Sequence, residues 1–467
     1  MSAPAAAPSP TVPPAAVPRL KLGTSPRGRW PVGHFRDFRN DPLGYLAACA
    51  RDHGDAVPLR FVGRRILLLS DPAAIGEVLL TRHRSFRKHA AMRQLARPAL
   101  GEGLLLSEGD TWQRQRRLAQ PAFRGERIAG YAQVMVEHAQ AMCDGWRDGQ
   151  TLDLQAELMA LTSRIVTRCL FGSELSGIAT GVGAAMDQLT LSFKERMDSA
   201  LRLPLWLPTA ANRRFRRGMT GLDGVLHTII EGRRRAPPQE DLLGALLAAS
   251  GEDGQPAFSD AQLRDQVATL FFAGHETTAN ALGWTQWLLM RHPQILTELE
   301  AEVDGVLGGC APSGADVPRL PYCAQVLDEA MRLMPPVWVL GREAVEPVEI
   351  AGIAVPTGTT VLMSQWVVQR DPRWFPEPER FLPARWTAEF AKQLPQFAYF
   401  PFGGGPRICI GNHFAKIEMV LLLATMIGRF RLRLAPDAEV VPLPSLTLRP
   451  RHGLRVVLTA RLGLPVR

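Results

Sequence analysis

One cysteine near the C-terminal end of the sequence stands in a loop that is suited to hold a metal. Cys409 follows three consecutive glycines at 403–405 and precedes an apolar segment with a helical pattern at 414–427. Glycine lets a backbone approach a ligand closely, and the N-terminal end of a helix carries positive partial charge that favours a thiolate. No CxxC or HxxxH pattern lies nearby, which disfavours zinc and iron–sulfur clusters. The loop therefore predicts one thiolate ligand to a soft, redox-active metal such as haem iron.

A second candidate for chemistry is the centre of a long predicted helix. A capping-box pattern at Ser259 and Gln262 marks its start, and Pro293 marks its end. Such a helix is roughly 45 Å long at about 1.5 Å per residue, enough to cross a domain. A glycine and two adjacent threonines weaken its middle. By spacing, one face of that middle carries mostly small residues, as a large flat group would require: Leu270, Ala273, Gly274, Thr277 and Ala281.

The elements that position these residues are predicted to be mostly helices. Helical patterns cover 41–53, 72–82, 111–122, 125–148, 152–171, 182–200, 211–234 and 241–250. Short β-rich runs occur at 56–61, 65–69, 348–350, 360–363, 430–434 and 454–460, separated by Gly and Pro turns. The pattern predicts a mainly α fold with a minor β region. We expect a Pro/Ala-rich, disordered tail at 1–29 and one catalytic domain at 30–467.

Composition excludes several classes of protein. Of 467 residues, 46% are hydrophobic and 21% are charged, which excludes wholesale disorder, a coiled coil and a collagen-like fibre. Lys and Arg number 54 against 45 Asp and Glu, but the basic clusters are short and scattered, so no nucleic-acid partner is expected. The longest nearly apolar stretch, at 419–427, is too short for a transmembrane anchor. Six cysteines without a CxxC pair favour a reducing, cytoplasmic location.

The cysteine loop resembles the haem-binding loop of the cytochrome P450 superfamily. The matching residues are Phe402-x-x-Gly405-x-Arg407-x-Cys409-x-Gly411. Further family patterns follow in the family's order: Trp112 to Arg116, Ala273 to Thr278, Glu329-x-x-Arg332, and Pro378 to Phe381. The resemblance covers roughly residues 30 to 460. It implies a single triangular fold around a buried haem b.

The resemblance also assigns roles at the haem. Cys409 would be the axial ligand of the iron. Thr277 and Glu276 match the family's acid–alcohol pair, in which Thr277 would hydrogen-bond dioxygen and Glu276 would relay protons. Matching positions for the propionates are Trp112, Arg116, Arg342 and Arg407, and those around the ring and thiolate are Phe402, Ala273, Gly274 and Gly411. Lys88 and His89 precede the predicted helix that carries Trp112 and Arg116. They could also contribute but are not included in the predicted site.

Two further sets of residues follow from the family positions. Glu329, Arg332 and Arg380 would form a structural triad, in which one buried carboxylate between two guanidiniums supports the cysteine loop. The substrate pocket is expected to include the apolar residues Leu270, Phe271, Val337, Trp338 and Val339. Apolar walls of this kind indicate a lipophilic substrate.

The implied activity is that of a bacterial haem-thiolate monooxygenase that inserts one oxygen atom of O₂ into a lipophilic small molecule. No nucleotide-binding fingerprint is apparent, so electrons are expected from a separate ferredoxin or flavodoxin with its reductase. We expect a monomer. The runs at 334–342 and 448–453 resemble bacterial members that oxidise terpenes in secondary metabolism, while fatty acids and polyketides remain alternatives. A peroxide-driven or isomerising enzyme and a non-catalytic haem-thiolate sensor are the competing interpretations.

Overall fold

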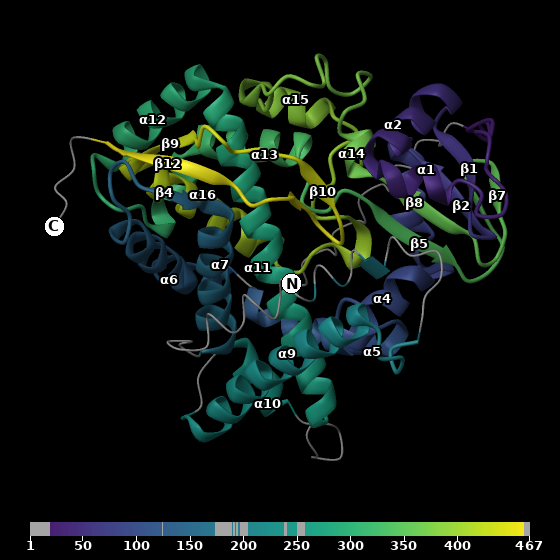
Figure 1. Cartoon of the computed structure of the whole chain (residues 1–467), viewed down its shortest axis with the longest axis horizontal. Helices are drawn as coiled ribbons and strands as arrows, with labels where there is room; N and C mark the ends of the chain where they lie inside the picture. The colour runs from purple at the N-terminus through teal and green to yellow at the C-terminus, as the bar shows by residue number, and fades with distance from the viewer. Residues whose placement is uncertain are drawn as a thin grey trace, which may run out of the picture.

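The computed structural model describes residues 19–123, 125–172, 189, 192, 195–196, 204–237, 241–249 and 257–461. Helices make up most of the described chain, and strands at 56–69, 86–88 and 340–363 form a strand-rich side at the right of Figure 1, whereas the strands at 151–153, 430–434 and 455–460 lie on the opposite side. This arrangement confirms the predicted fold class, mainly α with a minor β region. Among the described residues, we find no helix that combines the length and the apolarity needed to cross a bilayer.

The helices of the described chain range from single turns to one of 32 residues. Their bounds are α1 Phe35–Asn40, α2 Pro42–His53, α3 Pro72–Gly76, α4 Ala90–Leu100, α5 Gly109–Ala119, α6 Gly125–Asp144, α7 Leu154–Phe171, α9 Ala210–Arg235, α10 Leu242–Ala248, α11 Asp260–Arg291, α12 Pro293–Leu307, α13 Pro321–Leu333, α14 Gln365–Val368, α15 Ala388–Gln393 and α16 Asn412–Arg429.

Helix α11 runs through the middle of the helical part (Figure 1). The Ser259 hydroxyl accepts a hydrogen bond from the Gln262 backbone N–H, and the Gln262 side chain accepts one from Ser259, so the predicted capping box is present. The buried apolar residues in the N-terminal half of α11 belong to one cluster, and the last of them is Phe272. Those in the C-terminal half belong to another cluster, and the first of them is Ala279. The boundary between the two apolar clusters therefore falls on the weak centre of the helix.

The strands within the described ranges form two small sheets and two hairpins. The main sheet has the order β1 Ala56–Phe61, β2 Arg64–Leu69, β8 Thr360–Met363, β5 Leu340–Ala344 and β3 Phe86–Lys88, in which only β2 and β8 pair in parallel. The second sheet has the order β4 Thr151–Asp153, β12 Arg455–Ala460 and β9 Phe430–Leu434. The hairpins are β6 Val348–Ile350 with β7 Ile353–Val355, and β10 Pro442–Pro444 with β11 Leu448–Pro450.

The prediction of a disordered tail is wrong for its last eleven positions, residues 19–29. The backbone N–H of Leu20 donates to the carbonyl of Ala351 at 2.8 Å, and that of Gly23 donates to Ala56 at the start of β1, also at 2.8 Å. These bonds attach residues 19–29 to the strand-rich side. The rest of the predicted tail lies outside the described residues.

Some predicted helices differ at their ends or fall outside the description. The helix predicted at 72–82 is α3 followed by a π-helical turn, Glu77–Thr81. The helix predicted at 125–148 ends at Asp144, where Gly145 turns back to bond the carbonyl of Met142. Most of the helix predicted at 182–200 lies outside the described residues.

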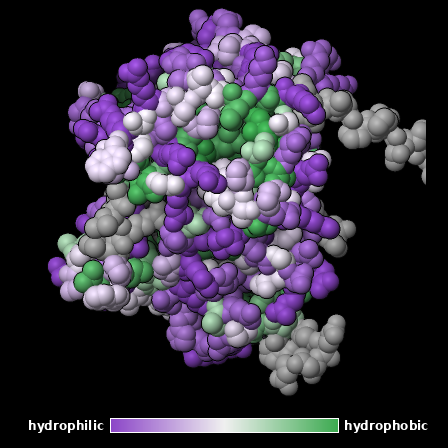
Figure 2. All heavy atoms as spheres, turned by 90° about the vertical axis from the view of Figure 1, so that its right-hand side faces the viewer, coloured by the Kyte–Doolittle hydropathy of each residue, from purple (hydrophilic) through white to green (hydrophobic). Residues whose placement is uncertain are grey.

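The strand-rich side faces the viewer in Figure 2, and hydrophilic side chains cover most of it. Among the exposed large apolar side chains of the molecule, Val62 lies in the turn between β1 and β2, and Val345 follows β5 directly. Apolar side chains are common on protein surfaces and do not by themselves indicate a binding face.

Candidate functional site

The centre of α11 has accessible surface between two buried stretches of the helix. Phe272, His275 and Glu276 are buried, whereas Ala273 is exposed and Thr277 is partly exposed. Ala273 and Thr277 are four residues apart and therefore lie on one face of the helix. Because buried clusters pack on α11 on either side of this point, we interpret the accessible surface here as the lining of an interior space, the hollow.

Cys409 resembles Ala273 and Thr277 in that it has accessible surface although protein surrounds it. Cys409 is exposed, yet burial raises the pKa of its thiol, while the backbone N–H of Gly411 and the charge of Arg116 lower that pKa. We interpret a thiol that is both exposed and desolvated as one that faces the same interior space. Its own N–H donates to the carbonyl of Phe402 at 3.0 Å, which closes the loop at its base.

The glycines of this loop serve packing. A side chain on Gly405, whose φ is +65°, would begin 1.8 Å from the carbonyl oxygen of Leu79. A side chain on Gly404 would begin 2.2 Å from the ring of Phe397. The sequence predicted that the glycines bring the backbone close to another group, and the groups they approach here belong to the protein.

Gly274 has a similar explanation. It is partly exposed, as a residue beside the hollow would be. A side chain at this position would begin 2.9 Å from a methyl group of Val166 on α7. The small residue is therefore needed for the approach of α7, although the sequence assigned it to a flat ligand.

Several cations converge beside the cysteine loop. The guanidinium of Arg407 lies 4.4 Å from the ring centre of Trp112, and that of Arg116 lies 5.9 Å from it. Arg116 also donates to the carbonyl of Ile408, next to the cysteine, at 2.8 Å. Arg342 on β5 pairs in register with Lys88 on β3. The structure thus brings together the predicted propionate-binding residues and adds Lys88.

One carboxylate, Glu108, serves this cation cluster within the described part of the chain. It forms an ion pair with Arg407 and accepts the backbone N–H of Lys88 at 2.7 Å. Burial, followed by the charge of Arg407, lowers the pKa of Arg342 to about 10. Burial, followed by the charges of Arg342 and Arg407, holds the pKa of Lys88 well below its ordinary value.

The cation cluster therefore carries more positive charge than its surroundings neutralise. A lowered pKa means that burial and mutual repulsion disfavour the charged forms, and an added anion would reverse this. The two propionates of a haem are anions of this kind. Lys88 could not be assigned from the sequence because its partnership with Arg342 depends on the pairing of β3 with β5.

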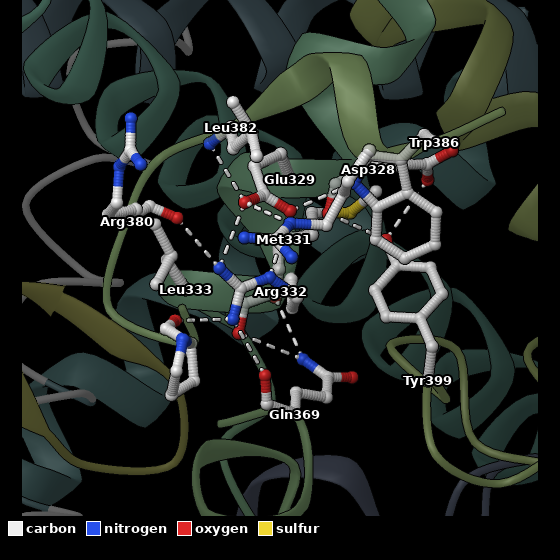
Figure 3. A network of polar contacts seen from close by, with 12 residues as sticks. Asp328, Glu329, Met331, Arg332, Leu333, Gln369, Arg380, Leu382, Trp386 and Tyr399 are labelled. Atoms are coloured by element: carbon white, nitrogen blue, oxygen red, sulfur yellow. Dashed lines mark hydrogen bonds and ion pairs between the residues drawn. The ribbon is translucent and has the colours of Figure 1, made fainter. Parts of the chain in front are cut away.

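A second group of buried charges surrounds Glu329 and Arg332 on α13 (Figure 3). Both side chains have 0% exposed surface, and Arg332 donates to the two carboxylate oxygens at 2.8 and 2.9 Å. Arg332 also donates to backbone carbonyls of Gln369, Pro378 and Arg380 at 2.9, 2.7 and 3.0 Å. Every one of these bonds lies within the chain.

The prediction that Arg380 completes this triad is wrong. Its carbonyl points to Arg332, so its side chain points away (Figure 3) and forms an exposed ion pair with Glu377. Arg385 takes the place instead, because a 3-10 turn at Pro383–Arg385 returns the chain to the carboxylate. Its Nε donates to Glu329 at 3.0 Å. The other donors to Glu329 are the Leu382 N–H at 2.9 Å and the Trp386 indole at 3.0 Å.

This network connects directly to the cysteine loop. The side chain of Gln369 donates to the carbonyls of Met331 and Arg332 on α13. Its oxygen accepts the backbone N–H of Phe400 at 3.2 Å. Phe400 stands two residues before Phe402, whose carbonyl accepts the N–H of Cys409. The buried charges thereby hold the segment from which the loop departs.

The predicted pocket residues face different directions. Val337 and Val339 are partly exposed, as residues bordering the hollow would be. Trp338 between them is buried and donates its indole N–H to the carbonyl of Ser445 at 2.9 Å. Phe271 is also buried, with its ring 4.9 Å from that of His275. Neither aromatic ring lines an open space, so their assignment to the pocket wall is wrong.

Leu270 is also buried, with 5% of its surface exposed. It belongs to the apolar cluster that packs on the N-terminal half of α11. Its side chain is therefore mainly a packing residue in this structure.

The side chains of Thr277 and Glu276, which are neighbours on α11, point to different surroundings. The hydroxyl of Thr277 donates to the carbonyl of Ala273 at 2.7 Å and stays at the accessible face. The carboxylate of Glu276 is buried and accepts the hydroxyl of Thr447 at 2.7 Å. Burial lowers the pKa of His275 to about 4, so this ring is neutral at physiological pH.

Comparisons with known proteins agree with this geometry. A family model described as Cytochrome P450 matches residues 24–456. The chain is 38% identical to cyclooctatin synthase of Streptomyces melanosporofaciens over 91% of this chain and 93% of that one. It is 35% identical to pentalenene oxygenase of Streptomyces avermitilis, over 94% and 97% of the two chains. It is also 35% identical to cyclooctat-9-en-7-ol 5-monooxygenase of Streptomyces melanosporofaciens, over 90% and 91%.

Proposed function

The chain belongs to the cytochrome P450 family, and we propose that it oxidises a terpenoid, with Cys409 as the thiolate ligand of its haem. The family makes it a haem-thiolate monooxygenase that uses O₂, a lipophilic substrate and a redox partner. When bound, the cysteine-ligated haem supplies the chemistry that places one oxygen atom in the substrate and the other in water.

The donor set supports this placement of the cofactor. Cys409 is the free cysteine that combines accessible surface with surroundings that desolvate its thiol. The charge of Arg116 and the Gly411 N–H both favour the thiolate form. Four cations would hold the propionates, with the Trp112 indole beside them: Arg116, Arg342, Arg407 and Lys88. The excess positive charge of these cations is the single observation that carries the proposal of an anionic ligand.

Thr277 and Glu276 would carry the protons. The Thr277 hydroxyl lies at the accessible face of α11, where it can donate into the hollow after leaving the carbonyl of Ala273. Glu276 is the neighbouring acid, buried on another face of the helix. A hydroxyl at the site and an acid behind it form the arrangement that general acid catalysis needs.

The substrate class follows from the relatives and from the lining. Two of the relatives are named for pentalenene and cyclooctat-9-en-7-ol, which are terpenoids. The partly exposed Val337 and Val339 and the exposed Ala273 offer apolar surface, which suits a hydrocarbon skeleton. We further propose that a separate ferredoxin or flavodoxin supplies the electrons and that the enzyme acts as a monomer.

The proposal is tested by product formation. Purified protein is supplied with NADPH, a surrogate ferredoxin with its reductase, ¹⁸O₂ and a panel of terpene hydrocarbons, with fatty acids of matched carbon number as controls. We expect a product from at least one terpene that gains a single ¹⁸O atom. Oxidation of the fatty acids alone would contradict the terpenoid assignment, and absence of any ¹⁸O product would contradict the assignment of Cys409 and the pocket to monooxygenation.

A further inference from the structure

Buried polar side chains from separate parts of the chain form a directed series that ends at Glu276. The amide of Gln155 on α7 donates to the side-chain oxygen of Asn280 on α11 at 2.8 Å. The amide of Asn280 donates to the hydroxyl of Thr447 at 3.1 Å, and this hydroxyl donates to Glu276 at 2.7 Å. Each donor therefore points toward the carboxylate.

The series is built into the core. All of its members are buried, and Asn280 has 0% exposed surface. Buried polar groups are costly unless they are hydrogen-bonded, and linked bonds polarise one another. A side chain on Gly283 would begin 2.4 Å from the amide oxygen of Gln155, so a missing side chain on α11 makes room for the first member.

Thr447 occupies a position that connects this series to the pocket side. It stands in the turn between β10 and β11, next to Leu446, which is partly exposed. Ser445 in the same turn accepts the indole N–H of Trp338, between the partly exposed Val337 and Val339. The turn that carries the hydroxyl is thus anchored to a segment that borders the hollow.

We propose that Thr447 is a positioning residue for Glu276. Its hydroxyl fixes the orientation of the carboxylate, because it donates a hydrogen bond to one carboxylate oxygen at 2.7 Å. From this position Glu276 accepts protons and passes them toward Thr277. The inference rests on the proposed roles of Glu276 and Thr277, and no contact of Thr447 with the haem is required.

The orientation of the Glu276 carboxylate should affect how consumed O₂ is divided between product, hydrogen peroxide and water. Monooxygenation takes one O₂, two electrons and two protons, and gives the hydroxylated product with one water. Release of hydrogen peroxide takes the same electrons and protons but leaves the O–O bond intact. Full reduction to two waters takes four electrons and four protons. Proton supply at the correct oxygen atom favours cleavage, so a misplaced carboxylate shifts the balance toward peroxide.

Three variants of the haem-loaded enzyme separate this role from packing. Thr447→Val keeps the shape and removes the hydroxyl, whereas Thr447→Ser keeps a hydroxyl. Thr285→Val is the matched control, because Thr285 is a buried threonine of α11 whose hydroxyl donates to the Ala281 carbonyl of its own helix. The probe is pentalenene with NADPH, a surrogate ferredoxin and its reductase. Peroxide, product and total O₂ consumption are measured together, so the balance is defined whether or not pentalenene is oxidised.

We expect Thr447→Val to raise the peroxide share of consumed O₂ roughly tenfold, as loss of a hydrogen bond to a charged group allows. Thr447→Ser should stay within about twofold of wild type, and Thr285→Val should leave the share unchanged. An unchanged peroxide share in Thr447→Val, or an equal rise in Thr285→Val, would overturn the inference. A wild-type enzyme that consumes no O₂ would instead overturn the proposed function.

A second readout does not depend on turnover. Unfolding midpoints are measured for wild type, Thr447→Val, Glu276→Gln and the double variant. If the hydroxyl acts through the carboxylate, the double variant loses less than the sum of the single losses. Additive losses would show that the two side chains do not interact, which contradicts the inference even if monooxygenase activity is present.

Discussion

Two groups of buried charges differ in how completely the chain neutralises them. In the Glu329–Arg332 network, described donors from Arg332, Arg385, Leu382 and Trp386 meet the carboxylate, and backbone carbonyls take the remaining guanidinium bonds. In the cation cluster around Arg342 and Arg407, the shared carboxylate is Glu108, and burial followed by mutual repulsion lowers the pKa values of Arg342 and Lys88. A complete network holds a fold together, whereas an incomplete one is suited to a charged ligand.

The largest expected effect comes from breaking the complete network. Glu329→Gln should lower the free energy of unfolding by about 3–5 kcal/mol, because it leaves Arg332 charged and buried without its counterion. Urea unfolding of the variant and of wild type measures the difference. A loss below about 1 kcal/mol would place this pair among ordinary surface ion pairs and remove one side of the comparison.

Glu418 on α16 extends the comparison to a buried acid without an ionic partner among the described residues. It has 0% exposed surface, and burial raises its pKa to about 8 from 4.5, against a weaker lowering by Thr278. The folded state therefore favours the protonated form. Relative to Glu418→Gln, wild-type stability is full below about pH 4.5 and falls by roughly 1.4 kcal/mol per pH unit up to about pH 8.

The measurement is the unfolding free energy of both proteins between pH 5 and 7, where the difference should change by about 3 kcal/mol. A difference that does not change over this range would mean that Glu418 is ionised in the folded protein. It would then require a counterion outside the described residues.

Arg385 and Arg380 provide a matched pair within the complete network. Arg385→Gln should cost about 2 kcal/mol of unfolding free energy, because its buried guanidinium bonds Glu329. Arg380→Gln should change stability by less than about 0.5 kcal/mol, since its side chain is exposed. Chemical denaturation compares the two. Equal losses would contradict the replacement of Arg380 by Arg385 in the triad.

Removal of a charge from the cation cluster should raise the unfolding free energy of the haem-free protein, whereas removal of one from the Glu329–Arg332 network lowers it. Lys88→Met removes a partly buried charge that is disfavoured by desolvation and repelled by Arg342 and Arg407, so the unfolding free energy of the haem-free protein should rise by about 1 kcal/mol. The same variant should lose haem about tenfold faster, because one partner for the propionates is gone. Haem transfer to apomyoglobin and urea unfolding of the haem-free form measure the two effects. A stability loss together with unchanged haem retention would show that Lys88 belongs to the fold alone.

The sequence predicted features that depend on local spacing. The capping box of α11, its end before Pro293 and the Glu329–Arg332 contact three residues apart all follow from helix geometry. The sequence did not predict that Arg385 rather than Arg380 contacts Glu329, because this contact depends on which way a non-helical segment turns. The orientation of Trp338 and the partnership of Thr447 with Glu276 also depend on contacts between distant segments, which periodicity does not encode.

The central claim is that Cys409 supplies the thiolate to the haem iron, and one spectrum tests it most directly. The dithionite-reduced protein is exposed to carbon monoxide, and wild type is compared with Cys409→Ser and with Cys310→Ser, the other exposed free cysteine. We predict a strongly red-shifted Soret band in wild type and Cys310→Ser that is lost in Cys409→Ser. The same band in Cys409→Ser, or a wild-type spectrum typical of a neutral ligand, would contradict the claim.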